Sequence, residues 1–518
     1  MVDAMAGKFK GENMLDLLIR GATVLDGTGR EGFLADIGVK DGKIVSVGEG
    51  GEAVRVIDAR GLTVTPGFID SHSHSDRAMR DYPDQREKIE QGITLSIAGQ
   101  CGSSVAPARD KDTGKLTTAK EFLQEIACVP QGSSAKMLIG HGSLRRVVMG
   151  SEKRAPTEAE LAQMKALLRE GLEAGALGLS FGLIYVPGCY ATTEECIELA
   201  RVVAEYDGIL AAHIRNEGDE LLEAVEEFLA VIKASGCRAV FSHHKAARKW
   251  NWGKVKKSLA MIDAANAAGA DIYVDAYPYV ASGTTLVATF LPKQFHFEGM
   301  TDALQLLEDP ERIAQIRAWA KGRWDNDYSW VLPYRIPGHD EYAGLNINEI
   351  ADLRGQADRM DTIYDLIRET NKAQGACFFS MSEEDVAYVL SHPRVMIGTD
   401  SSVACGKSVF HPRLRGTFPR VLGRYVRERG VTTLPEMIRK MTSLPAAVYG
   451  IPNKGVIREG ADADLCVFDA ARIIDGADFF EPTRKNEGLF FVILDGKIVV
   501  EDGIYNGTRA GRVYLEKR

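Results

Sequence analysis

Eight short apolar runs recur between residues 60 and 450, and a stretch with helical periodicity separates each run from the next. The amphipathic segment Glu158–Glu173 is one such stretch. Short apolar runs that alternate with amphipathic helices are typical of parallel strands joined by crossover helices. We therefore predict a (β/α)8 TIM-like barrel over residues 63–449. The runs are LTVTPGFID, GITLSIAG, AKMLIG, GALGLSFG, GILAAH, RAVFSHH, ADIYVDAYP and RVMIGTD.

The two ends of the chain carry similar hairpin signals. Asp41 and Gly42 separate alternating apolar residues near the beginning, and Asp495 and Gly496 do the same near the end. Neither end has enough strands to bury its own apolar face. We therefore expect residues 14–62 and 450–518 to combine into one small β-sandwich domain. Residues 1–13 are expected to be a disordered leader.

Residues 282–375 interrupt the alternation between the seventh and eighth predicted strands. The segment contains WDNDYSWVLPYRIPGHDEY and is far longer than the connections usual in such barrels. We predict an insertion within the barrel that forms a lid or a subdomain.

The composition, with 45% hydrophobic and 26% charged residues, is that of an ordinary globular protein. The net charge is −9 and no basic cluster is interleaved with aromatics, so we expect no nucleic-acid partner. No apolar stretch of about 18 residues occurs, so we expect no membrane partner either. The first residues lack the apolar core of a signal peptide and the cysteines form no CxxC pairs, which favours a cytoplasmic location. Nothing in these patterns specifies an oligomeric state.

Six metal-binding or ionisable side chains stand at the ends of predicted strands. The carboxyl ends of barrel strands meet on one face, where catalytic groups gather. Imidazole, thiolate and carboxylate groups are the ligands that zinc prefers. The mixed set favours zinc, because magnesium and calcium bind mainly oxygen ligands. A single strand-end histidine is more often structural, but six such groups on one rim predict a zinc site. A barrel that served only as an assembly scaffold would be expected to lack some of them. The six are His72, His74, Cys101, His213, His243 and Asp400.

Several motifs resemble those of a known family. PGFIDSHSHSD, DLLIRGATVLDGTG and GTDS are similar to the amidohydrolase superfamily of metal-dependent hydrolases. The resemblance narrows to the D-aminoacylases, or N-acyl-D-amino-acid deacylases, and covers nearly the whole chain from about Met14. The narrower motifs are GQCG, GLIYVPG, AHIRNEGDE, SHHK, DAYPY, FSMSEEDV and HPRLRGTFPRVLG.

The resemblance implies a division of the metal ligands. Cys101, His213 and His243 match the ligands of one tightly bound zinc, whereas His72 and His74 match a second, weaker site. Many relatives bridge two metals with a carboxylated lysine at strand four. Strand four here, GALGLSFG, has no lysine, and Cys101 takes the bridging position. This favours the deacylases over the alternative, another C–N amidohydrolase such as a dihydroorotase, hydantoinase or dipeptidase.

The implied activity is zinc-dependent hydrolysis of N-acyl-D-amino acids to a carboxylate and a free D-amino acid. Zinc acidifies a water molecule enough for attack on an amide at neutral pH. Asp400 matches the catalytic aspartate, which takes the proton of the water and passes it to the leaving amine. Tyr185 or His213 is expected to help stabilise the oxyanion.

The substrate contacts are also implied by the resemblance. The α-carboxylate is expected to meet Lys245, Arg413, Tyr277 and Ser282, of which Arg413 offers a bidentate fork. Ala281, Ser282 and Gly283 follow in that order where the family has Ala-Gly-Ser, so Ser282 is shifted by one residue. Apolar walls are expected around the side chain of the substrate, which favours hydrophobic D-residues over D-aspartate or D-glutamate. These walls are Phe181, Leu291, Phe378 and Met381.

Overall fold

The computed structural model describes residues 14–296, 300, 302–334, 336–372, 374–403 and 411–516. The expected leader, residues 1–13, lies outside the described residues. Within the described ranges, none of the helices combines the length and the apolar character that crossing a membrane requires.

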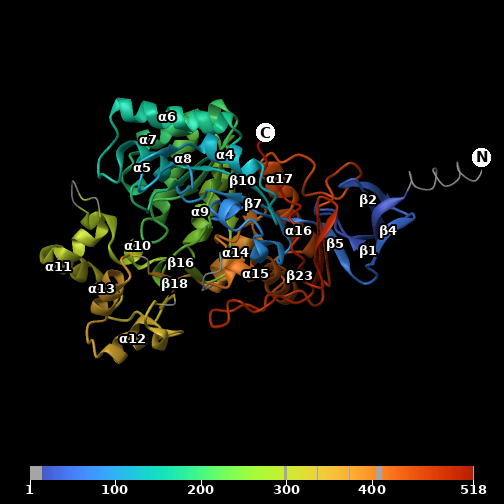
Figure 1. Ribbon diagram of the computed structural model, residues 1–518. Helices are drawn as coiled ribbons and strands as arrows, with labels where there is room; N and C mark the ends of the chain where they lie inside the picture. Colours follow the sequence, from blue (N-terminus) through green and yellow to red (C-terminus); the bar gives the residue numbers. More distant parts are fainter. Residues whose placement is uncertain are drawn as a thin grey trace, which may run out of the picture.

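Parallel strands close into a ring, of which β7 and β10 lie near the centre of the molecule in Figure 1. Two hydrogen-bonded sheets, β10-β7-β6 and β11-β12-β13-β14-β15-β19, share one strand position, since β10 and β11 follow each other along the chain. The ring closes where Ser71 N donates to Ile397 O at 3.1 Å and Ser73 bridges Ser401 in parallel. All eight predicted apolar runs contribute to it. The strands are β6 (Phe68–Asp70), β7 (Ile93–Ala98), β10 (Ser134–Met137), β11 (Ile139–Gly140), β12 (Gly178–Gly182), β13 (Ile209–His213), β14 (Arg238–Phe241), β15 (Ile272–Ala276) and β19 (Val395–Ile397).

Helices pack around this ring through their apolar faces. The helix α6 begins where Thr157 and Glu160 form a capping box, which satisfies backbone N–H groups that the first turn leaves free. In α8, apolar residues three and four positions apart are buried, as in an amphipathic helix against a core. The main helices are α4 (Ala119–Ala127), α5 (His141–Met149), α6 (Glu158–Glu173), α7 (Thr193–Glu205), α8 (Leu221–Ser235), α9 (Lys254–Ala267), α14 (Glu383–Ser391), α15 (Arg413–Arg420), the π-helical η6 (Val421–Glu428), α16 (Leu434–Met441) and α17 (Ser443–Val448).

Strands from both ends of the chain form one small sheet, at the right in Figure 1. Its order is β23-β22-β21-β20-β5-β1-β2-β3, with β4 beside β1. Buried residues of both chain ends, among them Ile19, Val64 and Leu465, belong to one apolar cluster. The strands are β1 (Leu15–Val24), β2 (Phe33–Lys40), β3 (Lys43–Gly48), β4 (Ala53–Asp58), β5 (Thr63–Pro66), β20 (Leu465–Phe468), β21 (Leu489–Leu494), β22 (Lys497–Glu501) and β23 (Ile504–Tyr505).

Two predicted domain boundaries differ from the structure. Residues 63–66 were expected to begin the barrel, but they pair with β20 and β1 in the small sheet, and Phe68–Asp70 alone enters the ring. At the other end, Gly511 bridges Gln131 and Val513 bridges Ala135. The chain thus leaves the small sheet and runs along the barrel. There it bonds to backbone groups at β10, and Val513 packs against the apolar core of the barrel.

The segment between β15 and β19 has secondary structure and a core of its own. An antiparallel sheet of order β16-β18-β17 joins its two ends, so it extends slightly beyond the predicted bounds 282–375. Its buried residues, such as Phe290, Trp324 and Phe378, form a cluster separate from that of the barrel. We call residues 281–379 the insertion. Its main elements are β16 (Ala281–Thr285), α10 (Leu286–Phe290), η3 (Lys293–Phe295), α11 (Pro310–Ala320), β17 (Val331–Pro333), α12 (Ile347–Arg354), α13 (Arg359–Glu369) and β18 (Gly375–Phe379).

Candidate functional site

The six predicted strand-end groups meet at one end of the barrel. Two clusters of possible metal ligands form there, and in each the ligand atoms lie within 4.8 Å of one another. Cys101 belongs to both clusters, as its predicted bridging position requires. Its Sγ lies 3.3 Å from His72 Nε2 and 3.2 Å from His243 Nε2. One cluster is His72, His74, Cys101 and Asp400, and the other is Cys101, His213 and His243.

Three of these residues hold unusual backbone conformations. Cys101, His243 and Asp400 have φ angles of 53°, 34° and 48°, in the left-handed region that non-glycine residues seldom enter. Each lies two or three residues beyond the end of a barrel strand, where the left-handed turn directs its side chain onto the rim. Such strain persists only where the surroundings fix it, and it gathers at functional sites.

The donor set fits a zinc ion. Both ring nitrogens of His213 are buried and have no hydrogen-bond partner among the described residues, so one of them is free to bind a metal, whereas a buried structural histidine seldom lacks partners. Burial alone would raise the pKa of the Cys101 thiol, but His243 and His72 bring that pKa well below its usual value. A thiolate with neutral imidazoles is a ligand set typical of zinc.

Two buried carboxylates hold the histidines from behind. Asp275 is fully buried and contacts His72 Nδ1 at 3.1 Å, and it also accepts a bond from the His243 backbone N–H at 2.7 Å. Glu217 lies 3.0 Å from His243 Nδ1 and accepts a bond from Lys245 Nζ at 2.6 Å. Carboxylates in this position orient metal-binding imidazoles. Sequence reasoning gave neither a role, although DAYPY and AHIRNEGDE contain them.

Asp400 lies between a histidine and an arginine. His74 Nε2 is 3.1 Å from its Oδ1, and Arg413 Nη1 donates to its Oδ2 at 2.7 Å. Burial would raise the pKa of this carboxyl, but Arg413 and the surrounding histidines hold it well below the usual value. Asp400 is therefore ionised at neutral pH and able to accept a proton. Arg413, predicted to bind substrate, also contacts the predicted catalytic group.

A buried polar network joins the first and eighth strands beside the site. Lys88 Nζ donates to Asp70 Oδ2 at 2.8 Å, to Thr399 Oγ1 at 2.6 Å and to Ser401 O at 3.2 Å. Asp70 in turn accepts bonds from the backbone N–H groups of His72 and Thr399. The network therefore fixes the backbone next to both His72 and Asp400. Lys88 was not singled out in the sequence.

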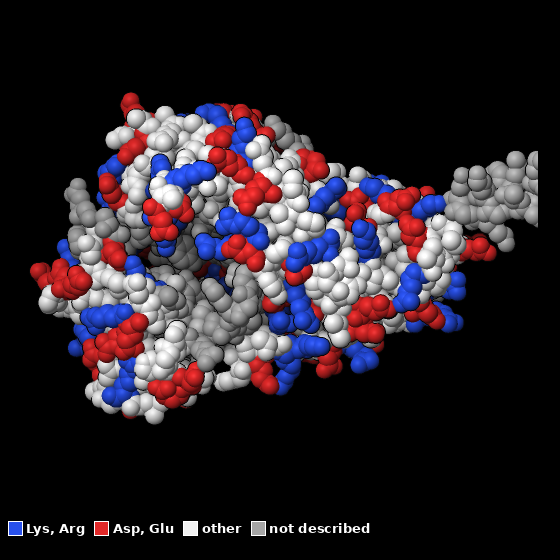
Figure 2. All heavy atoms as spheres, viewed as in Figure 1, with Lys and Arg blue, Asp and Glu red and all other residues white. Residues whose placement is uncertain are grey.

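A cavity of about 700 Å³ opens above the ligands. The barrel forms one wall and the insertion the other, and Figure 2 shows the surface hollowed between these two parts. Most predicted site residues line it, whereas His72 is fully buried beneath. Arg413 and Lys245 lie over the ring of Tyr277, at 5.3 and 5.5 Å from its centre. The predicted residues that line the cavity are His74, Cys101, Tyr185, His213, His243, Lys245, Tyr277, Ser282, Leu291, Asp400 and Arg413.

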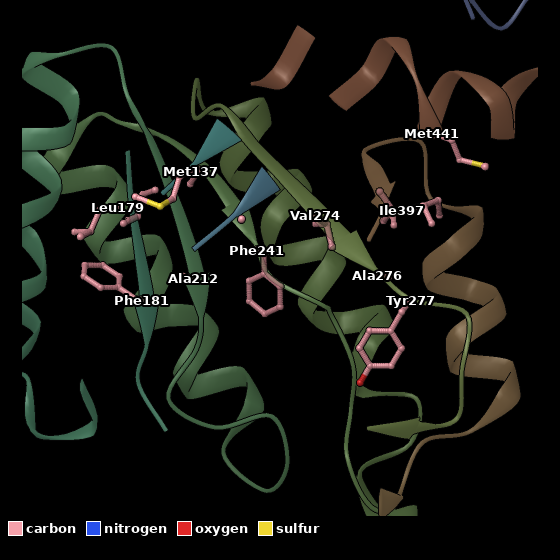
Figure 3. Close-up of a cluster of buried hydrophobic side chains, with 14 of the residues drawn as sticks. Met137, Leu179, Phe181, Ala212, Phe241, Val274, Ala276, Tyr277, Ile397 and Met441 are labelled. Atoms are coloured by element: carbon pink, nitrogen blue, oxygen red, sulfur yellow. The ribbon is translucent and has the colours of Figure 1, made fainter. Parts of the chain in front are cut away.

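The predictions for Phe181, Met381 and Phe378 are wrong. Phe181 lies among Leu179 and Ala212 in the packed barrel (Figure 3) and faces the helices outside it, because alternate residues of a strand point to opposite sides. Met381 packs behind Lys245 and Tyr277, and Phe378 lies in the core of the insertion. None of the three lines the large cavity.

Comparisons with known proteins agree with this geometry. The model of the amidohydrolase family matches residues 55–500, and that of the N-terminal domain of the urease alpha-subunit matches residues 2–66. The chain is 35% identical to a D-aminoacylase of Alcaligenes xylosoxydans xylosoxydans over 96% of its own length and 97% of that protein. It is 36% identical to an N-acyl-D-glutamate deacylase of the same organism, and that match covers 94% of this chain and 93% of the deacylase.

Solved structures give the same result. An N-acyl-D-glutamate deacylase from Bordetella bronchiseptica, in complex with zinc and a phosphonate inhibitor, has a TM-score of 0.83 and 35% identity, and the match covers 97% of this chain and 100% of that one. A D-aminoacylase structure has a TM-score of 0.82 and 35% identity, and the match covers 96% of this chain and 99% of that one. The chain belongs to the amidohydrolase family and, within it, to the D-aminoacylases.

Proposed function

We propose that the protein hydrolyses the amide bond of N-acyl-D-amino acids to a carboxylate and a free D-amino acid. The observation that carries the proposal is Cys101, which lies in both ligand clusters beside an ionised Asp400. The relatives named above, a D-aminoacylase and an N-acyl-D-glutamate deacylase, support the same reaction. Strand β12, Gly178–Gly182, contains no lysine that could bridge two metals.

Zinc is the proposed cofactor. Cys101, His213 and His243 would hold one ion tightly, and His72 and His74 would hold a second, weaker one. When bound, zinc supplies Lewis acidity at the amide carbonyl and lowers the pKa of water. A zinc complex of one relative and a binuclear centre described for another support a metal here.

The protein side chains would move the protons and hold the substrate. Asp400 takes a proton from the attacking water and passes it to the leaving amine, since its carboxylate is ionised and faces the cavity. The Tyr185 hydroxyl lies 3.4 Å from Thr284 Oγ1, and its ring lies 5.1 Å from that of His213, so it can donate to the developing oxyanion beside the metal ligands.

The α-carboxylate would bind between Lys245 and Arg413. Both cations lie over the Tyr277 ring, and the Tyr277 hydroxyl is buried without a hydrogen-bond partner among the described residues. Arg413 bonds Asp400 through Nη1, which leaves N–H groups free for a substrate carboxylate. Ser282 lines the same wall and can donate its hydroxyl. Of the four predicted apolar wall residues, Leu291 lines the cavity and Phe181, Phe378 and Met381 do not, so the argument for hydrophobic side chains of the substrate rests on Leu291.

The proposal is tested by release of free amine from matched N-acetyl-D- and N-acetyl-L-amino acids, with a hydantoin and dihydroorotate as cyclic controls. We expect turnover of the D series only, loss of activity on chelation and recovery with zinc. Equal rates on the L series would refute the stereochemical assignment. Preferred turnover of a cyclic amide would favour the hydantoinase-like alternative.

A further inference from the structure

A second cavity, of about 380 Å³, lies where the segment between β14 and α9 meets the insertion. It shares no lining residue with the large cavity above the metal ligands. The chain has five tryptophans, and four of them line this second cavity. They are Trp250 and Trp252 from the segment after β14, and Trp324 and Trp330 from the insertion. Aromatic side chains therefore gather at a place that the proposed reaction does not use.

Several of the aromatic side chains in this cavity are open to solvent. Trp250 and Trp252 are 44% and 47% exposed, and Phe379, which lines the same cavity, is 37% exposed. Exposed apolar surface that is contiguous marks sites of interaction more often than chance. The volume lies in the range of about 300–1,000 Å³ that is usual for pockets that bind small molecules. A small ligand with an aromatic part therefore fits this cavity.

One cation lies among these rings without a direct anionic partner. The Arg248 guanidinium carbon is 5.1 Å from the centre of the Trp324 ring and 5.9 Å from that of Trp250. Within the described part of the chain, its side chain forms no ion pair and no hydrogen bond. Burial lowers the pKa of Arg248, and the attraction of Asp219 offsets this only in part.

Asp219 is the nearest acidic influence on Arg248, but other donors hold its carboxylate. Its Oδ1 accepts bonds from Trp250 Nε1 at 2.7 Å and from Asn251 Nδ2 at 3.0 Å. Its Oδ2 pairs with Arg323 of the insertion. Both oxygens of Asp219 therefore already have partners, and the charge of Asp219 is shared between two arginines.

The two carboxylates that line the cavity do not contact Arg248 either. Asp325 is exposed to solvent. Asp327 accepts bonds from the Ser329 backbone N–H at 3.0 Å and from Asn348 Nδ2 at 2.8 Å. The N–H groups of the Arg248 guanidinium therefore remain available to an added anion.

The backbone holds Arg248 in this position. Its φ angle of 78° lies in a region that non-glycine residues seldom adopt. Its backbone N–H donates to Ser380 O at 2.6 Å, and Trp252 Nε1 donates to the same oxygen at 2.9 Å. The rings and the guanidinium are therefore arranged before a ligand arrives, which lowers the entropic cost of binding.

We propose that this cavity binds a planar aromatic carboxylate, at a site separate from that of the proposed hydrolysis. The carboxylate pairs with the Arg248 guanidinium, whose planar fork of N–H groups matches it. The aromatic ring lies against Trp250, and because 5.9 Å separates that ring centre from the guanidinium carbon, one small molecule can contact both. Neither residue takes part in the proposed reaction, so the inference does not rest on it.

Calorimetry on the full chain with three small molecules tests the proposal. Indole-3-acetate has both the ring and the charge, indole-3-acetamide has the ring without the charge, and acetate has the charge without the ring. We expect indole-3-acetate to bind at least about tenfold more tightly than either of the others, because only it uses both parts of the site. Absence of binding, or equal binding of either of the other two, would overturn the proposal.

A charge variant locates the bound molecule, since the large cavity also contains arginine and lysine side chains. Arg248→Met should weaken the binding of indole-3-acetate by about 10- to 100-fold, as expected for the loss of a charge-assisted bond. Lys321→Met, an exposed change of the same charge in the insertion, should leave the affinity unchanged. Wild-type affinity in Arg248→Met would refute the site.

A pair of variants at Trp250 tests the ring contact. Trp250→Leu should weaken binding by about two- to tenfold, the usual contribution of an aromatic pair. Trp250→Phe keeps a ring but cannot donate to Asp219, and it should retain most of the affinity. Trp250 is exposed, so neither change empties a core. An equal loss in both variants would refute the ring contact and assign the effect to the bond with Asp219.

Discussion

Asp275→Asn is a change of one atom that should disable a metal ligand. The carboxylate of Asp275 accepts a bond from His72 Nδ1–H, which leaves Nε2, 3.3 Å from Cys101 Sγ, unprotonated and able to bind a metal. In the variant, the amide oxygen can still accept from the His243 backbone N–H, and the amide NH2 then faces Nδ1. His72 must accept at Nδ1 and carry its proton on Nε2, where it can no longer bind a metal.

The expected size of the effect follows from the bond that is lost. A hydrogen bond to a charged partner contributes about 1.5–3 kcal/mol. At about 1.4 kcal/mol for each factor of ten, this corresponds to a 10- to 100-fold loss of metal affinity, which agrees with the usual effect of removing such a supporting group. The loss should fall on the second metal, held by His72 and His74, because His243 keeps its backbone contact.

The assay is metal stoichiometry after dialysis against graded zinc, together with deacylation. The variant should retain about one tightly bound zinc and lose the weaker one. Asp275→Ala is the matched comparison, since it also removes the acceptor of the His243 N–H and should weaken both sites. Wild-type affinity at both sites in Asp275→Asn would refute the tautomer argument.

Asp400→Asn should lower kcat by about 10²–10⁴-fold with zinc still bound, because it removes the proton acceptor; near-normal turnover would mean that another base acts. Lys88→Met should destabilise the fold by about 3–5 kcal/mol in urea denaturation, since Asp70 is left buried and unpaired. Lys440→Met is its control and should change stability little, because the equally buried Lys440 donates, within the described part of the chain, only to the carbonyl oxygen of Leu390. Burial would raise the pKa of Asp219, but bonds from neighbouring side chains lower it to about 2. Its stabilising contribution should be complete above about pH 4 and fade between about pH 4 and pH 2, so the stability difference between wild type and Asp219→Asn should vanish over that range; a difference independent of pH would contradict this.

The ligand rim could be predicted because barrel topology converts chain position into spatial position. Cys101 and His243 are 142 residues apart, yet both follow a parallel strand, and all such ends meet on one face. The pattern of apolar residues was enough to predict the strands and the helix Glu158–Glu173, which has the same limits in the structure. The apolar runs carry that information locally.

The cavity walls could not be predicted in the same way. Phe181 and Met381 are apolar residues near the site, but periodicity does not tell which side of a strand or loop faces the cavity. Asp275 and Glu217 act through contacts with residues distant in the chain, which no local pattern encodes. The strand Thr63–Pro66 was predicted as part of the barrel because it is continuous with the apolar run of β6. An apolar run does not show which strand it pairs with, and in the structure this strand pairs with β20.

The cavity walls come from two bodies with separate cores. The groups proposed for chemistry stand on the barrel, while Leu291, Lys293 and Met300 belong to a segment that folds around its own apolar cluster. Substitutions that reshape this segment need not disturb the rim, because they act on different packing. Substitutions in the insertion, or its exchange for that of a relative, can therefore change the substrate specificity while the reaction stays the same.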